Sequence, residues 1–210
     1  MHIIMDLLPQ SKYNLKSPYP MDAELIVIHN TSNDAPAKNE VEYMKNNNLQ
    51  KSFHFAVDDI EIRQALPLYR NAWHAGDGNI GNGNRCGIAI EICYSKSGGE
   101  RFEKAEENAA ALVAQLLKER KWGIERVKKH QDFSGKYCPH RTLDMGWDRF
   151  LKMIERHMVE ELTAINDIVW ELSSRSIITN KDLWMEKLNN DEDAYWLARK
   201  CANYIRGNVK

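Results

Sequence analysis

Long hydrophobic runs are missing from this sequence of 210 residues. None approaches the roughly 20 consecutive apolar residues that a membrane-spanning helix requires, so membrane insertion is not expected. The first 20 residues have no basic segment ahead of an apolar core, and Asp6 and Pro9 interrupt the short apolar stretch. Such a start is not typical of a secretory signal. We therefore predict that the protein is made in the cytoplasm.

An excess of charge of either sign is also missing. The chain has 29 basic and 30 acidic side chains, which gives a net charge of −1. A protein that binds nucleic acid through its phosphates usually carries a basic surface, so a nucleic-acid partner is not expected. The charge pattern also lacks a basic tail that could hold the protein on a membrane surface.

Cysteine is scarce, and no two cysteines form a C-x-x-C pair; the four are Cys86, Cys93, Cys138 and Cys201. A protein made in the cytoplasm rarely contains disulfides, so we expect free thiols. Cys93 lies in an apolar run and Cys201 in a helical pattern, and both are predicted to be small buried hydrophobic residues. Only Cys138 has a crowded polar neighbourhood.

Several stretches have the periodicity of regular secondary structure. Residues 23–31 form an apolar run of strand length that ends near His29, and residues 85–95 form the clearest strand. Side chains in residues 53–57 alternate between two faces, and the segment that follows is predicted to be the hairpin partner of this strand. Helices are predicted after Pro36 and over residues 102–121, where Gly123 is expected to end the helix. This irregular order predicts an α/β (α+β) fold, with a central mixed β-sheet flanked by helices.

The C-terminal part is predicted to be a small all-helical module. An apolar stripe at helical spacing runs from Trp147 to Leu172 without a break near residue 160, so the domain boundary is expected inside one long helix. We assign residues 1–158 to the first domain and residues 159–210 to the second. Thr179 is predicted to cap a further helix because an acidic residue, Asp182, follows three positions later.

One segment, "KKHQDFSGKYCPHR" at residues 128–141, concentrates side chains that bind metals. His130 and Cys138 are eight residues apart, and His29 ends a buried strand far away in the sequence. A catalytic zinc ion is typically held by three such ligands. From the residues alone, two interpretations stay open: a loop that holds a metal, or a surface turn with a buried thiol.

Five motifs, in chain order, resemble those of the type-2 N-acetylmuramoyl-L-alanine amidase family: "IVIHNT", "FHFAVDD", "NAWHAG", "GIAIEI" and "KHQDFSGKYCPHR". This family has the peptidoglycan-recognition-protein fold and includes phage endolysins. The resemblance covers roughly residues 20–158. It implies that His29, His130 and Cys138 bind one zinc ion, which favours the metal loop.

The resemblance also implies two catalytic residues. Glu91 matches the acidic residue that acts as general base, and Lys136 matches a basic residue that could stabilise an oxyanion. Without the family, Glu91 is a solvent-facing strand residue and Lys136 a surface charge. Some relatives use a tyrosine before the histidine of the "FHF" strand, but Phe53 occupies that position here.

Three further residues are predicted to contact substrate: Trp73, His74 and Asn84. Trp73 and His74 precede a glycine- and asparagine-rich loop, and Asn84 ends it. The competing interpretation is that Trp73 packs in the core and that His74 is exposed.

The resemblance implies zinc-dependent hydrolysis of the amide bond between N-acetylmuramic acid and L-alanine in peptidoglycan. The alternatives are a non-catalytic peptidoglycan-binding module and a cytoplasmic amidase that recycles wall fragments. Non-catalytic members of the fold typically lack the thiol ligand, so Cys138 favours the enzyme. A phage-type endolysin released through a membrane pore would fit the predicted cytoplasmic synthesis. Wall targeting and structural support are equally compatible with the aromatic residues of the C-terminal module.

Overall fold

The computed structural model describes residues 3–205, apart from the side chains at positions 160–162, 192 and 203–205. It consists of two compact units, Met1–Ile154 and Glu155–Lys210. The division lies inside the helix α7 (Trp147–Ser174), and the boundary predicted at residue 158 falls in the same helix. Within the described residues, no helix is long and apolar enough to cross a membrane.

The first unit is built on a six-stranded mixed sheet with the strand order β1-β4-β3-β5-β2-β6. Strands β3 and β4 pair antiparallel, and the other neighbouring strands pair parallel. The predicted mixed sheet and hairpin are therefore confirmed. The strands are β1 (Ile3–Met5), β2 (Leu25–Asn30), β3 (Phe55–Val57), β4 (Ile62–Gln64), β5 (Gly87–Ile92) and β6 (Val127–Lys129).

Strands β2 and β5 form the centre of this sheet. Residues 26–30 of β2 are all buried, as are five of the six residues of β5. Near-continuous apolar runs of this kind are typical of parallel strands that are covered on both faces. The register of the pair places His29 beside Glu91 at the carboxyl ends of the two strands.

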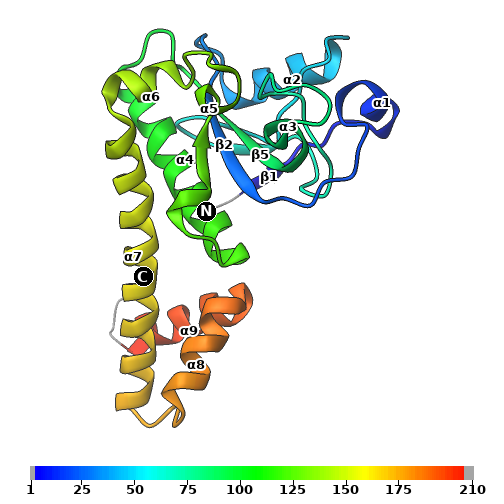
Figure 1. Ribbon diagram of the computed structural model, residues 1–210. Helices are drawn as coiled ribbons and strands as arrows, with labels where there is room; N and C mark the ends of the chain where they lie inside the picture. The colour runs from blue at the N-terminus through cyan, green and yellow to red at the C-terminus, as the bar shows by residue number, and fades with distance from the viewer. Residues whose placement is uncertain (1–2, 206–210) are drawn as a thin grey trace. The chain divides into compact units, whose positions relative to one another are not determined.

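Helices flank the sheet, as predicted. The long helix α4 (Gly99–Arg120) packs against β5 and β3, and α2 (Ala37–Asn46) packs against β3 and β4 (Figure 1). Pro36 precedes α2, as expected. The shorter helices of the first unit are η1 (Gln10–Lys12), α1 (Tyr13–Lys16), α3 (Asn82–Cys86), η2 (Ile124–Arg126), α5 (Gln131–Ser134) and α6 (His140–Met145).

Two predicted element ends are wrong. Helix α4 ends at Arg120, one residue before the predicted end at residue 121, and Lys121 ends it in place of the predicted Gly123. Lys121 adopts a left-handed conformation with φ of 55°, and its N–H bonds to the carbonyls of Leu117 and Lys118. This backbone arrangement satisfies the last carbonyls of the helix without a glycine. The strand predicted over residues 85–95 is shorter, because Arg85 and Cys86 complete α3.

The second unit contains the C-terminal part of α7 together with α8 (Lys181–Asn190) and α9 (Glu192–Ile205). Its buried cluster consists of Ile165, Ile168, Val169, Leu172, Ile178, Leu188, Ala198 and Ala202. Asn180, rather than the predicted Thr179, caps α8 by accepting a hydrogen bond from the N–H of Leu183 at 3.0 Å.

All four cysteines are free thiols, as predicted, and Cys93 is buried. The prediction that Cys201 is buried is wrong, because its side chain is exposed. The inward stripe of α9 runs through Ala198 and Ala202, four residues apart. Cys201 is one residue away from that stripe, which turns its side chain by about 100° around the helix axis.

Candidate metal and active site

Three buried side chains, His29, His130 and Cys138, bring their donor atoms together at one edge of the sheet. All their ligand atoms lie within 4.8 Å of one another. His29 Nδ1 is 3.0 Å from His130 Nδ1 and 3.9 Å from Cys138 Sγ. In a tetrahedral zinc site, such pairs of donor atoms are about 3.4 and 3.6 Å apart, so small shifts would admit an ion.

The fold explains why residues so far apart in sequence meet there. Strand β6 pairs in parallel with β2, and Ile28 lies beside Lys129, so the next residues, His29 within β2 and His130 just after β6, lie side by side. Cys138 returns to them because the N–H of Gln131 donates to the Cys138 carbonyl oxygen at 3.0 Å. This bond closes the segment of residues 131–138 into a compact loop.

A second layer of contacts orients the histidines. His74 Nδ1 lies 2.9 Å from His29 Nε2, which leaves His29 Nδ1 to face the cluster. His130 forms a hydrogen bond with the backbone of Ala75. Partners of this kind set the tautomer and the ring orientation of histidines that bind metals. His74, which was predicted to contact substrate, is therefore in place to orient His29 as a metal-binding residue.

Asn84 organises the loop that carries His74. Its Oδ1 accepts hydrogen bonds from the N–H groups of His74 and Ala75, both at 2.8 Å, and its Nδ2 donates to the carbonyl oxygen of Gly78 at 3.1 Å. The side chain is buried and its polar atoms already have partners within the protein. Substrate contact by Asn84 stays a prediction, whereas its contacts hold His74 in place.

Glu91 lies beside the cluster, and its surroundings favour the protonated carboxyl. Its Oε2 is buried and has no hydrogen-bond partner among the described residues. Burial, followed by the charge of nearby Glu40, raises the pKa of Glu91 to about 8, while Lys136 opposes the shift. A carboxyl with a pKa in this range can both accept and return a proton near neutral pH.

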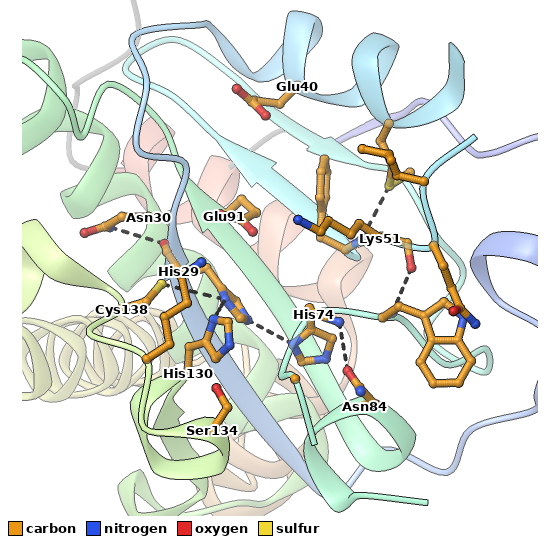
Figure 2. A pocket seen from close by; sticks show the side chains of 18 of the residues that line it. His29, Asn30, Glu40, Lys51, His74, Asn84, Glu91, His130, Ser134 and Cys138 are labelled. Carbon is orange, nitrogen blue, oxygen red and sulfur yellow. Dashed lines mark hydrogen bonds between the residues drawn. The ribbon is translucent and has the colours of Figure 1, made fainter. Parts of the chain in front are cut away.

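The cluster opens into a cleft of about 570 Å³. All eight residues predicted as site residues line it: His29, Trp73, His74, Asn84, Glu91, His130, Lys136 and Cys138. Figure 2 shows His29, His130 and Cys138 on one side of the cavity and Lys51 reaching in from the other. The sequence interpretation missed this second side, which α2 and residues 47–53 form. Those residues have no metal-binding or catalytic pattern of their own.

The sequence profile described as N-acetylmuramoyl-L-alanine amidase matches residues 19–141, more than half of the chain. The chain belongs to this amidase family. The resemblance predicted from the five motifs is thereby confirmed. All eight predicted site residues lie inside the matched segment.

Individual amidases and solved structures resemble the same part of the chain. N-acetylmuramoyl-L-alanine amidase CwlA of Bacillus subtilis is 59% identical over 157 residues, which are 74% of this chain and 58% of CwlA. The structure of PlyL is 54% identical with a TM-score of 0.71, and covers 73% of this chain and 97% of PlyL. A mutant endolysin from Bacillus subtilis is 43% identical with a TM-score of 0.67, and covers 73% of this chain and 99% of that one. This chain thus spans little more than half the length of CwlA.

Burial favours the neutral form of the histidines in this cleft. Burial lowers the pKa of His29 well below its usual value, lowers that of His74 to about 3, and, together with Lys136, lowers that of His130 to about 4. A neutral imidazole is the form that binds a metal. Burial, followed by Glu91, raises the pKa of Cys138 to about 11. A bound cation would reverse that preference, because a coordinating thiol loses its proton.

Proposed function

We propose that this chain is a zinc-dependent N-acetylmuramoyl-L-alanine amidase, which hydrolyses the amide bond between N-acetylmuramic acid and L-alanine in peptidoglycan. The observation that carries the proposal is the position of Glu91 beside a three-donor cluster that opens into a cleft. The Glu91 carboxyl has a buried oxygen with no hydrogen-bond partner in the described part of the chain. Family membership and the similarity to CwlA support the choice of substrate.

Zinc suits the donor set of His29, His130 and Cys138, because two imidazoles and one thiolate are borderline-soft ligands that leave a fourth position open. The chemistry that a bound zinc ion supplies is Lewis-acid polarisation of the substrate carbonyl and activation of water. The hydrogen-bonded pair of His29 and His74 supports this assignment, since it directs the His29 Nδ1 lone pair toward the other two donors.

Glu91 is the proposed general base and acid. Its carboxylate takes a proton from the attacking water, and the resulting carboxyl returns that proton to the nitrogen of the leaving L-alanine. The pKa of about 8 supports both transfers near neutral pH. We assign Lys136, which lines the same cleft, to stabilise negative charge on the carbonyl oxygen; its opposing effect on the pKa of Glu91 supports this role.

Substrate binding falls to the walls of the cleft. Trp73 lines it with a largely buried indole and contacts Tyr19 edge-on, with ring centroids 6.0 Å apart. A rigid aromatic wall suits the apolar face of a sugar or peptide. We assign Trp73 to that wall and His74 to the rim beside the metal, with Asn84 supporting His74 through its backbone N–H.

The test combines metal content with hydrolysis of a soluble muramoyl peptide. The purified full chain should contain one zinc ion and release free peptide, and Cys138→Ser should lose most of both. Glu91→Gln should keep its zinc and lose about 100-fold or more in rate, because the proton carrier is removed while the shape is kept. Cys86→Ser is the matched control, as Cys86 lies outside the cleft lining.

Two results would contradict these assignments. Full activity of the Cys138→Ser protein after treatment with a chelator would refute the metal dependence. Loss of zinc from Glu91→Gln would make Glu91 a ligand instead of a proton carrier.

The setting we propose is lysis of the bacterial cell wall of the endolysin type, and the similarity to an endolysin from Bacillus subtilis supports it. The chain should therefore clear suspensions of purified walls. A chain that cleaves soluble muramoyl peptides but leaves walls intact would instead favour recycling of wall fragments.

For the C-terminal unit we propose wall targeting. Its supporting feature is exposed aromatic surface, since Trp170 is 68% exposed and Trp196 is 42% exposed. A chain ending at residue 159 should cleave soluble substrate at the wild-type rate but clear walls more slowly, because targeting raises the local concentration of enzyme. If truncation lowers turnover of soluble substrate and melting temperature together, the unit is a structural support.

A further inference from the structure

Lys16, at the end of α1, is a fully buried lysine that lies outside the segment matched by the family profile. Its Nζ donates to Asn47 Oδ1 at 2.7 Å and to the carbonyl oxygen of Lys51 at 3.2 Å. Among the described residues it has no carboxylate partner. A buried ammonium that bonds only to uncharged oxygens is costly to desolvate. Its clearest structural consequence is the position of the residues that it holds.

Those residues form a loop of residues 47–52, without regular secondary structure, which we call the 47–52 loop. The loop is fixed at both ends. At one end, Asn47 Oδ1 also accepts the N–H of Leu49 at 2.9 Å. At the other end, Ser52 Oγ donates to the Lys16 carbonyl oxygen at 2.6 Å and accepts the N–H of Trp73 at 2.9 Å. Lys16 therefore connects the loop to the aromatic wall of the cleft.

The 47–52 loop places one cation over the cleft. Lys51 is exposed and lines the cavity, and Figure 2 shows its amine directed toward the side where Glu91 and His29 lie. The described residues provide this amine with no hydrogen bond or ion pair; only the Lys51 carbonyl is engaged, by Lys16. The amine is thus available to a ligand in the cleft.

We propose that Lys51 is a specificity-determining residue that binds a carboxylate of the stem peptide beyond the scissile amide, and that Lys16 is the positioning residue that holds it there. This inference rests on the proposed function. The cation reaches in from the wall opposite the ligand cluster, so a substrate that extends across the cleft from the metal would meet it. A charge-assisted hydrogen bond to a carboxylate is stronger than a bond to a neutral amide, which allows the site to tell the two apart.

The test compares two soluble substrates of the zinc-loaded full chain. Both are N-acetylmuramoyl dipeptides of L-alanine and D-glutamate; in one the α-carboxylate is free, and in the other it is an amide. The wild-type protein should favour the free acid. Lys51→Met should reduce the ratio of kcat/KM values, acid over amide, by about tenfold, mainly through KM for the acid. Lys51→Arg should retain the preference because it keeps the charge.

Lys16→Met should produce the same loss of preference while Lys51 is intact, because the loop is no longer held. The matched control is Lys12→Met. Lys12 reaches the same loop by donating to Asn48 Oδ1 at 2.9 Å, but this bond is exposed and is expected to contribute little. Its variant should keep the wild-type preference.

Each outcome bears on a separate claim. If the wild-type protein cleaves neither substrate, the proposed amidase function fails. If it cleaves both and Lys51→Met leaves the ratio unchanged, only the role of Lys51 is refuted. If Lys16→Met melts at a lower temperature and loses activity equally on both substrates, Lys16 is a structural residue and its positioning role is refuted.

Discussion

The stability of the first unit should fall in mild acid because of one buried histidine, His54. The backbone N–H of Ala89 donates to His54 Nδ1 at 3.0 Å, and His54 Nε2 lies 2.9 Å from the Arg70 carbonyl oxygen. Nδ1 must therefore accept while Nε2 donates, which defines one neutral tautomer. Protonation of Nδ1 would place two N–H donors, those of His54 and Ala89, face to face and break this hydrogen bond.

The size of the effect follows from the pKa. Burial lowers the pKa of His54 from 6.5 to about 4 in the folded protein. Because the unfolded chain binds the proton more readily, the stability is present above pH 6.5 and is lost as the pH falls toward 4. For these two pKa values, linkage gives a loss of about 2 kcal/mol between pH 7 and pH 5.

The assay is equilibrium urea unfolding of the zinc-loaded wild-type protein and of His54→Asn at both pH values. Asparagine does not titrate and its side-chain oxygen can still accept the N–H of Ala89. Both proteins share all the other titrating groups, so the difference in stability between them reports on position 54. The wild-type protein should be more stable at pH 7, by about 1–3 kcal/mol for the lost bond to the Arg70 carbonyl. That advantage should shrink by about 2 kcal/mol at pH 5. An advantage that stays constant between the two pH values would refute the assigned tautomer and its pKa.

Two further predictions concern the metal site and the core. His74→Phe removes the partner of His29 Nε2, so the affinity for zinc should fall by about 10- to 100-fold. Competition with a chelating dye measures this affinity, and one ion should still bind at saturation. Unchanged affinity would exclude an orienting role for His74. The Glu106 carboxylate is 1% exposed and forms an ion pair with Arg149 at 2.5 Å. Arg149→Met removes that partner, so the free energy of unfolding of the first unit, measured in urea, should fall by about 3 kcal/mol. Adding Glu106→Leu should restore most of that loss, and an additive double variant would contradict the argument.

The local elements followed from short-range patterns in the sequence. The apolar run around Val27 and the alternation up to Ile92 predicted β2 and β5, and the stripe from Trp147 to Leu172 predicted α7. Element ends were less predictable. Lys121 ends α4 in a conformation more typical of glycine, and Asn180 caps α8 where Thr179 was expected, because several neighbouring residues can satisfy the same backbone groups.

Residue identity and order were also enough to nominate the side chains of the site. A strand-end histidine, a second histidine and a cysteine eight residues later are donor types that zinc prefers, and the motifs between them pointed to the family. The profile match confirms that family. Residue types and their order are enough to predict these features, because the metals that a side chain binds depend on its chemical type.

Only the tertiary structure decided how these side chains are surrounded. It buried a Glu91 carboxyl oxygen that no described residue hydrogen-bonds, engaged Asn84 with backbone groups, and exposed Cys201 on α9. It also brought Lys16, which no motif marked, against the 47–52 loop through contacts 31 and 35 residues apart. Desolvation and hydrogen bonding depend on which distant segments pack together, and a linear pattern of residue types does not contain that information.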